Sequence, residues 1–308
     1  MITSGILIIN KPGGLTSHDV VGRVRRALNV RQVGHAGTLD PMATGVLVIC
    51  IGQATRISEY LLGHDKAYRA AIRLGVETDT YDADGQVTET HEVHIDAATL
   101  QTALAGFVGD IQQVPPMYSA LKREGKKLYE LARDGIEVER PARPVTIHSI
   151  DLIDFRSPDL TIDVRCSAGT YVRSLAHDLG AKLNTGAHLI ALQRTASGPF
   201  TLADALGLSE FEAAAREDQP PFHIRSIDEA LSDWPLVTLN DLDRIRAITG
   251  GPIESLQLPG TRCRAHDQHG DLIALLTFDQ KKKWWRAEKV LAMTNDQSFN
   301  YRTTELPH

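Results

Sequence analysis

Asp40 is the side chain whose surroundings in the sequence best suit chemistry. It lies in Gly34–Leu47, which holds three glycines, one histidine and a single carboxylate, and which runs into the apolar segment 46–51. Pro41 biases Asp40 away from helix, so we expect the carboxylate on an irregular loop that feeds a strand. An ionised carboxylate there can act as a nucleophile. The stretch contains no Lys or Arg, so its counter-charge must come from elsewhere, unless Asp40 faces solvent or a ligand. The alternative is an ordinary Asp-Pro turn.

The whole of this stretch resembles the active-site motif of the TruB family of tRNA pseudouridine synthases. In that family the aspartate is catalytic, which implies this role for Asp40. The resemblance also implies that His35 fills the place that an extruded base leaves in the RNA stack. The segment Lys11–Ser17 resembles the first family motif, which implies that Lys11 supports the catalytic loop.

Tyr68 lies in the segment 66–75, which reads as a strand. Taken alone, it would be an aromatic residue of the core or of a sheet edge. Together with the following Thr78-Asp79-Thr80-x-Asp82, the Lys-x-Tyr pattern resembles the second family motif. This resemblance implies that Tyr68 stacks on the target base and takes part in proton transfer.

Arg173 falls in the first turn of a helix predicted to begin near Thr170, which is a plausible N-cap. A cation is unfavourable beside the positive end of the helix dipole, so the position suggests a dedicated anionic partner. The alternative is a solvated arginine. The segment Cys166–Arg173 resembles the third family motif, in which the arginine pairs with the catalytic aspartate. By that resemblance Arg173 pairs with Asp40, and Tyr171 lines the pocket.

Leu192 is an apolar residue of the predicted strand 187–194, so core packing is its default interpretation. By position it matches a leucine that lines the uridine pocket in the family. The family often has a second basic residue where this chain has Gln193, and that departure leaves the implied catalytic set complete.

The elements that must position these residues are strands and helices in alternation. We expect buried strands at 5–10 and 46–51. We expect one helix that begins at Thr16 or Ser17, and a second helix over 53–62. Periodicity indicates a mixed α/β protein. The family resemblance implies that the sheet is mainly antiparallel, in the pseudouridine synthase fold.

Domain organisation follows from length and from the distribution of charge. The chain has 308 residues and a formal net charge of -6, which matches the balance of the acidic segment 203–233 alone. We expect a catalytic domain over 1–202, a partly helical acidic linker attached to it over 203–233, and a β-rich domain over 234–308. The last resembles the PUA-like RNA-binding domain of bacterial TruB proteins. Within it Lys281–Arg286 mixes bases with aromatics, which suits RNA contact or a hairpin tip with a half-buried tryptophan.

Several classes of protein are excluded by pattern. The three cysteines are far apart in the sequence, which argues against a disulfide framework or a zinc site and favours a reducing, cytoplasmic compartment. No apolar run approaches the roughly 20 residues that cross a bilayer, and the N-terminus lacks a signal-peptide pattern. The sequence shows no metal-ligand cluster, Walker loop or dinucleotide fingerprint, so we expect neither a metal nor a cofactor.

The resemblance implies an isomerase that converts uridine to pseudouridine at position 55, in the T-loop of tRNA. We expect tRNA, through its T-arm, as the partner of a stand-alone, monomeric enzyme without an obligate protein partner. One alternative is a synthase that depends on a guide RNA and protein partners. The alternative from another class is a non-catalytic tRNA-binding or tRNA-folding protein.

Overall fold

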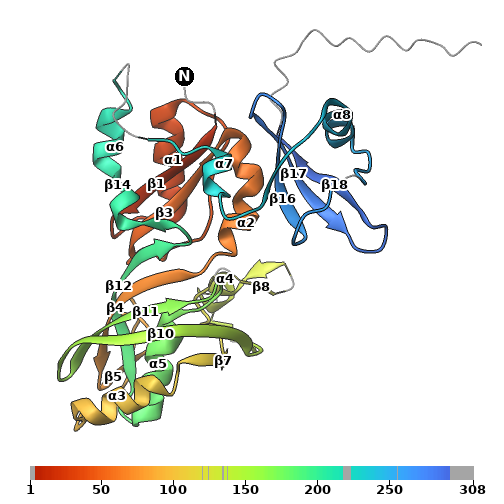
Figure 1. Cartoon of the computed structure of the whole chain (residues 1–308). Coiled ribbons are helices and arrows are strands. Elements are labelled where there is room, and N and C mark those ends of the chain that lie inside the picture. Colours follow the sequence, from red (N-terminus) through yellow and green to blue (C-terminus); the bar gives the residue numbers. More distant parts are fainter. Residues whose placement is uncertain are drawn as a thin grey trace, which may run out of the picture. The chain divides into compact units, whose positions relative to one another are not determined.

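The computed structural model describes residues 4–119, 121–123, 125–133, 135–136, 138–217, 223–254 and 256–291. The chain forms two compact units, Met1–Ile224 and Arg225–His308 (Figure 1). Within the described ranges, no helix combines the length and the apolar composition that crossing a membrane requires.

The first unit alternates strands with short helices. Its first half contains β1 (Gly5–Lys11), α1 (Ser17–Leu28), β2 (Val33–His35), β3 (Thr44–Ile51), η1 (Gly52–Ile57), α2 (Ser58–Leu62), β4 (Lys66–Leu74), β5 (Val76–Thr78), β6 (Val87–Thr90), α3 (Ala97–Ala105) and β7 (Gly109–Gln113). Its second half contains β8 (Lys122–Arg123), β9 (Lys126–Lys127), α4 (Leu128–Arg133), β10 (Arg143–Arg156), β11 (Asp159–Cys166), α5 (Val172–Leu183), β12 (Ala187–Ser197), β13 (Phe200–Thr201), η2 (Leu202–Asp204), β14 (Leu206–Gly207) and α6 (Leu208–Ala214).

A ten-stranded sheet organises this unit. Its strands follow the order β14-β1-β3-β12-β4-β11-β10-β7, and β2 and β13 pair with β3 and β12. Only the β1–β14 and β3–β12 pairs are parallel. The predicted mixed α/β class with a mainly antiparallel sheet is therefore confirmed. Strand β12 lies between β3 and β4, and so between the segments that carry Asp40 and Tyr68.

The apolar segments predicted as strands form the core. Residues Ile6, Ile9, Leu47 and Ile49 are fully buried, because β1 and β3 are covered on both faces. Helix α1 packs on them through Val20 and Val24, which are fully buried. Thr16 is its N-cap, and it forms a capping box with Asp19.

Two predicted helices differ in detail from the structure. Residues 52–57 form the 3-10 helix η1, and only Ser58–Leu62 is α-helical. Helix α5 begins at Val172 with Tyr171 at the N-cap, whereas the sequence suggested Thr170. The reason is a contact from β7. The side chain of Gln113 accepts a hydrogen bond from the backbone N–H of Tyr171 at 2.8 Å and donates one to its carbonyl at 3.0 Å.

The segment predicted as an acidic linker is divided between the two units. Helix α6 belongs to the first unit, where it packs beside α1 (Figure 1) and Phe211 is fully buried. Glu212 forms an ion pair with Arg23 of α1, so one of the acidic residues balances a basic one. The division after Ile224 differs from the expected boundaries at 202 and 233.

The second unit is β-rich, as predicted. It contains α7 (Ile227–Ala230), β15 (Leu236–Thr238), α8 (Asp241–Thr249), β16 (Arg262–His266), β17 (Leu272–Asp279) and β18 (Trp284–Val290). The strands form one sheet in the order β15-β16-β17-β18. Trp285 is buried and donates a hydrogen bond to the carbonyl of Leu256 at 3.2 Å, whereas Trp284 is half-buried. Residues 292–308 of the expected C-terminal domain lie outside the described residues.

Candidate active site

A cavity of about 590 Å³ opens in the first unit, where the loop before β3 meets β4, β12 and the start of α5. Five of the predicted site residues line this cavity: Asp40, Tyr68, Tyr171, Arg173 and Leu192. The fold therefore gathers at one place side chains that come from widely separated parts of the sequence. The sheet register accounts for this convergence, because β12 pairs with both β3 and β4.

The neighbours of Asp40 in the loop fix its position. The Oγ of Ser17 accepts a hydrogen bond from the backbone N–H of Leu39 at 2.8 Å and donates one to its carbonyl at 3.1 Å. On the other side, the carbonyl of Pro41 accepts hydrogen bonds from the backbone N–H of Gly14 at 2.8 Å and from Nζ of Lys11 at 3.1 Å. The segment 11–17 thus holds the loop on both sides of the carboxylate.

Lys11 lies beneath this loop and is fully buried. Its Nζ also donates hydrogen bonds to the carbonyls of Pro12, at 2.9 Å, and Leu15, at 2.6 Å. Burial lowers the pKa of Lys11 to about 8, while the charge of Asp40 acts in the opposite direction. Lys11 is outside the set of cavity-lining residues, so its contacts are those of a support for the loop.

Arg173 lies between two carboxylates. Its Nε is 2.9 Å from Oδ2 of Asp40, and its Nη1 is 3.3 Å from Oδ2 of Asp82. The guanidinium also donates hydrogen bonds to the carbonyls of Thr80 at 3.2 Å and Tyr118 at 2.8 Å. The side chains of Arg173 and Asp82 are 5 % and 7 % exposed, whereas that of Asp40 is 37 % exposed. Asp40 is thus the member of the trio that is open to the cavity.

The electrostatic surroundings of Asp40 act in both directions. Protein surrounds the carboxylate on every side except the cavity, and this removal from water raises its pKa above the ordinary value. The negative charge of Asp82 adds to that effect, whereas the guanidinium of Arg173 opposes it. The ion pair therefore offsets part of the cost of keeping Asp40 ionised in a partly desolvated site.

Aromatic and apolar side chains form the walls of the cavity. Burial raises the pKa of Tyr68 and of Tyr171, so both phenols are neutral near pH 7. The charge of Arg173 opposes this effect on the pKa of Tyr171, and the charge of Arg194 opposes it on the pKa of Tyr68. Leu192 is 8 % exposed and faces the same space. A planar heterocycle can lie against such walls while its reacting atoms approach Asp40.

His35 is the other predicted site residue outside the lining set. It belongs to β2, opposite Ile49 of β3, and is half-buried. Its Nδ1 is buried without a hydrogen-bond partner, and burial lowers the pKa of the imidazole. The role of His35 in replacing an extruded base stays a prediction.

Two residues at the site received no role from the sequence. Asp82 was noted only as part of a motif, yet it is the second carboxylate on Arg173. Arg194, which lines the cavity, follows directly after Gln193, the position at which this chain departs from the family pattern. The motif that contains Asp82 was a signal for that residue in the sequence, whereas the contacts of Arg194 depend on the pairing of β12 with β3.

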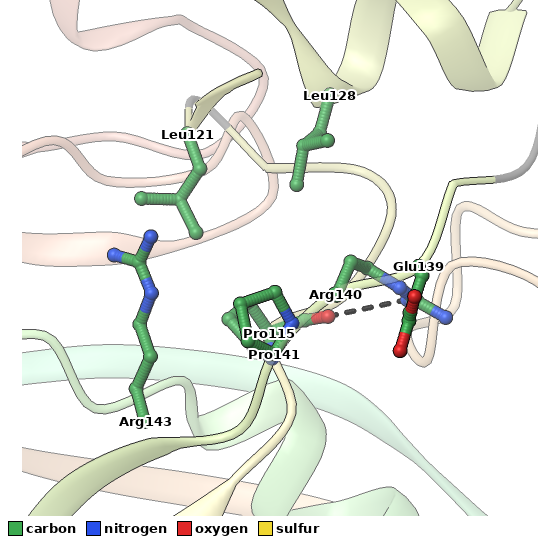
Figure 2. Close-up of a pocket in the computed structure, with 7 residues that line it drawn as sticks. All are labelled: Pro115, Leu121, Leu128, Glu139, Arg140, Pro141 and Arg143. Carbon is green, nitrogen blue, oxygen red and sulfur yellow. Dashed lines mark hydrogen bonds between the residues drawn. The ribbon is translucent and has the colours of Figure 1, made fainter.

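A second cavity, of about 410 Å³, shares Leu121 with the first. Figure 2 shows the residues that line this second cavity. One side of this cavity is closed by Arg140, whose Nη1 donates a hydrogen bond to the carbonyl of Pro115 at 3.1 Å. Its other lining residues are Leu128, Glu139, Pro141 and Arg143.

Within the part of the chain that the structure describes, one group of side chains has the spacing of metal ligands. Glu77, Glu89 and His91 lie on the β5–β6 pair, away from the residues that line the active-site cavity. Glu89 and His91 are exposed, and His91 already lies 3.2 Å from Glu89. The group thus has the character of a surface ion pair.

The sequence of the chain matches two family models. Residues 25–172 match the N-terminal domain of the TruB family of pseudouridylate synthases, and residues 173–232 match the C-terminal domain of tRNA pseudouridylate synthase B. The chain is 52 % identical over 233 residues to tRNA pseudouridine synthase B of Syntrophotalea carbinolica, which covers 75 % of this chain and 76 % of that protein. The chain belongs to the TruB family.

Other TruB relatives extend the similarity. The chain is 45 % identical over 278 residues to tRNA pseudouridine synthase B of Burkholderia pseudomallei, which covers 88 % of this chain and 92 % of that protein. The predicted family and enzyme class, a pseudouridine synthase, are confirmed. The family's C-terminal model ends at residue 232, so the PUA-like character of residues 234–308 stays a prediction.

Solved structures show the same fold. A crystal structure of a Cbf5–Nop10–Gar1 complex matches with a TM-score of 0.72 at 26 % identity, over 93 % of this chain and 84 % of that chain. An H/ACA RNP bound to a substrate RNA that contains 2′-deoxyuridine matches with a TM-score of 0.71 at 23 % identity, over 94 % of this chain and 86 % of that chain.

Proposed function

We propose that this protein converts uridine to pseudouridine at position 55 in the T-loop of tRNA. The observation that carries the proposal is the pairing of Asp40 with Arg173 in a cavity walled by Tyr68, Tyr171 and Leu192. The names of its relatives support tRNA as the substrate class. The preference for position 55 rests on the motif resemblance.

The reaction is an isomerisation that balances without an external reagent. The C1′–N1 bond of uridine breaks and a C1′–C5 bond forms. The proton lost from C5 is matched by a proton gained at N1. A carboxylate can attack C1′ or assist proton loss at C2′, and both routes need Asp40 as its anion. We assign Asp40 to this step and Arg173 to holding its carboxylate in place.

The substrate base must leave the RNA stack before it can reach Asp40. Extrusion costs roughly a few kcal/mol, which contacts inside the cavity must offset. We assign stacking on the uracil ring to Tyr68, and the opposite wall of the pocket to Tyr171 and Leu192. Tyr68 is the phenol to which the resemblance gives a part in proton transfer. His35, the last residue of β2, is proposed to occupy the vacated stack.

The enzyme is proposed to act alone, as a monomer on the T-arm of tRNA, without a cofactor, a guide RNA or a protein partner. The solved relatives include protein complexes and an RNP, so this independence is a specific claim about the present chain. A cytoplasmic location fits the three cysteines, which are buried and unpaired.

Mapping the product tests the proposal. An unmodified tRNA transcript is incubated with the purified full chain alone. Pseudouridine is then located by carbodiimide modification and primer extension. We expect one stop, next to position 55, and none in a transcript that carries cytidine there. Modification elsewhere would overturn the assigned position.

A lack of modification would bear on the alternatives. If the tRNA binds but stays unmodified, the non-catalytic binding or folding protein is favoured. If modification requires an added guide RNA or protein fraction, the stand-alone claim fails.

A further inference from the structure

Arg194 is a buried cation to which the reaction described above gives no role. It lies in β12 and is 1 % exposed. In the part of the chain that the structure describes, it forms no ion pair with a carboxylate, unlike Arg173. Burying an unpaired guanidinium is costly unless its N–H groups find hydrogen-bond partners. Its position therefore calls for an explanation beyond packing.

The partners of Arg194 are backbone carbonyls on both sides of Asp40. Its Nε donates to the carbonyl of Val46 at 2.7 Å, and its Nη2 donates to that of Gly37 at 3.0 Å. A longer contact of 3.4 Å joins Nη1 to the carbonyl of Thr38. Gly37 and Thr38 precede Asp40, and Val46 follows it. One rigid guanidinium thus joins the two ends of the catalytic loop.

Strand register places Arg194 where this bridge can form. Arg194 is opposite Gly45 in the parallel β3–β12 pair and opposite Tyr68 in the antiparallel β4–β12 pair. At Gly45, φ is +98° and an added Cβ would lie 2.2 Å from the carbonyl oxygen of Arg194. Glycine at this position therefore permits the close approach of β3 to β12.

The planar fork of arginine suits this arrangement better than an ammonium would. Its N–H groups point in fixed and divergent directions, so they can donate to the carbonyls of Val46 and Gly37 at the same time. A lysine at the same place keeps the positive charge but concentrates its donors on one nitrogen. Substitution by lysine thus separates the bridging geometry from the charge.

We propose that Arg194 is a positioning residue, which fixes the backbone on both sides of Asp40 and so places its carboxylate for reaction. The inference rests on the proposed function, because the consequence of misplacement is measured as the rate of pseudouridine formation. A displacement of about 1 Å at a reacting group can lower a rate by about 100-fold. The bridge to Gly37 and Val46 is short enough to control displacements of that size.

The test compares the variant Arg194→Lys with the parent protein. Arg73→Lys is the matched control, because Arg73 pairs with Asp159 on the exposed side of β4. Single-turnover rates at saturating protein, dissociation constants for tRNA and thermal midpoints are measured for all three. We expect R194K to lose about 10- to 100-fold in single-turnover rate. Its tRNA affinity should stay within about threefold of the parent, since phosphate contacts dominate that affinity.

Each outcome separates the positioning role from other roles. A rate for R194K equal to that of the parent would overturn the proposal, as would a loss confined to tRNA affinity. If R194K does not fold, Gly37→Ala serves instead, because its added Cβ would lie 3.4 Å from Nη1 of Arg194 and φ is +116° there. A G37A variant that folds and keeps the single-turnover rate of the parent would then overturn the positioning role of Arg194. An inactive parent protein would refute the proposed function itself.

Discussion

At the scale of single residues, the site consists of one guanidinium between two carboxylates. Arg173 is held by Asp82, by two carbonyls and by Asp40, so it cannot move away from Asp40 without losing several contacts. Asp82 is almost fully buried; its Oδ2 faces Arg173, and its Oδ1 accepts hydrogen bonds from Oγ1 of Thr80 at 2.5 Å and from the backbone N–H of Asp84 at 3.1 Å. Its function is therefore to orient Arg173, while Asp40 stays open to the cavity.

This arrangement predicts the pH dependence of activity. In the proposed reaction Asp40 acts as its anion, so we expect the rate to fall as pH falls through the pKa of Asp40. Burial and the charge of Asp82 raise that pKa, so the acid side of the pH–rate profile lies above 3.8, the ordinary pKa of an aspartate. Asp82→Asn removes a negative charge that raises the pKa of Asp40, so we expect the acid side of the pH–rate profile to move to lower pH. We also expect the plateau rate to fall roughly tenfold, because Arg173 loses an anchor.

Single-turnover rates measured from pH 4 to 8 test this prediction. Asp159→Asn provides the control, since Asp159 forms an exposed ion pair with Arg73 on the same sheet. Its profile should match that of the parent. If the acid side of the D82N profile stays in place or moves to higher pH, the charge of Asp82 does not act on Asp40.

At the scale of elements, the catalytic loop is held between the β1–α1 connection and β12. Lys11, Gly14 and Ser17 bind one side of the loop through Pro41 and Leu39, and Arg194 binds the other. All these contacts go to backbone atoms. The loop can thus be rigid although its own residues are small, and its rigidity depends on neighbours that are distant in sequence.

Lys11→Met tests the support from the β1–α1 connection. The substitution removes the donor of three partly buried hydrogen bonds to backbone carbonyls, so we expect the free energy of unfolding to fall by about 1–3 kcal/mol. The pKa of Lys11 is about 8 in the folded protein, whereas a lysine in water has a pKa of 10.5. Between these two pH values the unfolded chain therefore binds more protons than the folded protein. Stability conferred by this group therefore rises with pH across that window.

Urea unfolding of the parent and of K11M at pH 7, 8 and 10 measures both effects. The difference in stability between the two proteins should grow from pH 8 to pH 10. A difference that shrinks over this range would mean that folding does not lower the pKa of Lys11.

Gly45→Ala tests the close approach of β3 and β12. The added methyl group meets the carbonyl of Arg194, and the φ of +98° is strained for alanine, so we expect a loss of at least about 2 kcal/mol. Gly22→Ala is the matched control, because Gly22 lies inside α1 with nothing within 4 Å of the added Cβ. That variant should gain about 0.5–1 kcal/mol in urea unfolding. Equal effects of the two substitutions would contradict the packing described for Gly45.

At the scale of the whole molecule, the first unit contains the entire proposed active site, and the second is a separate β-rich unit. The β17–β18 connection of the second unit carries three exposed lysines, Lys281, Lys282 and Lys283. Nζ of Lys282 lies 5.1 Å from the centre of the Trp284 ring. Exposed bases beside an aromatic ring suit contact with RNA.

Replacing the three lysines by glutamine should separate binding from chemistry. Each lost phosphate contact lowers the slope of log affinity against log salt by about 0.7–0.9, so we expect weaker tRNA binding and a shallower slope. The single-turnover rate at saturating protein should be unchanged, because the active-site cavity lies in the first unit. An unchanged salt dependence would remove this connection from the RNA-binding surface.

The sequence predicted those features that depend on local pattern. The strands that contain Leu7 and Leu47, the start of a helix at Thr16 or Ser17 and the motif residues Asp40 and Arg173 were all accessible to it. The partners of Arg173 and Arg194 were less accessible, because they depend on strand order and register. Asp82 reaches Arg173 only because β5 and its following turn lie beside β12. Arg194 reaches the loop only because β12 lies parallel to β3.

Release of tritium from C5 of uridine tests the central claim most directly. A tRNA transcript labelled at uridine C5 is mixed with the purified chain, or with Asp40→Asn, and tRNA binding by both proteins is verified. Only substitution at C5 frees this label. The account predicts release by the parent protein and none by the variant. Release by both would show that Asp40 does not carry the reaction, and release by neither, with binding intact, would contradict the proposed activity.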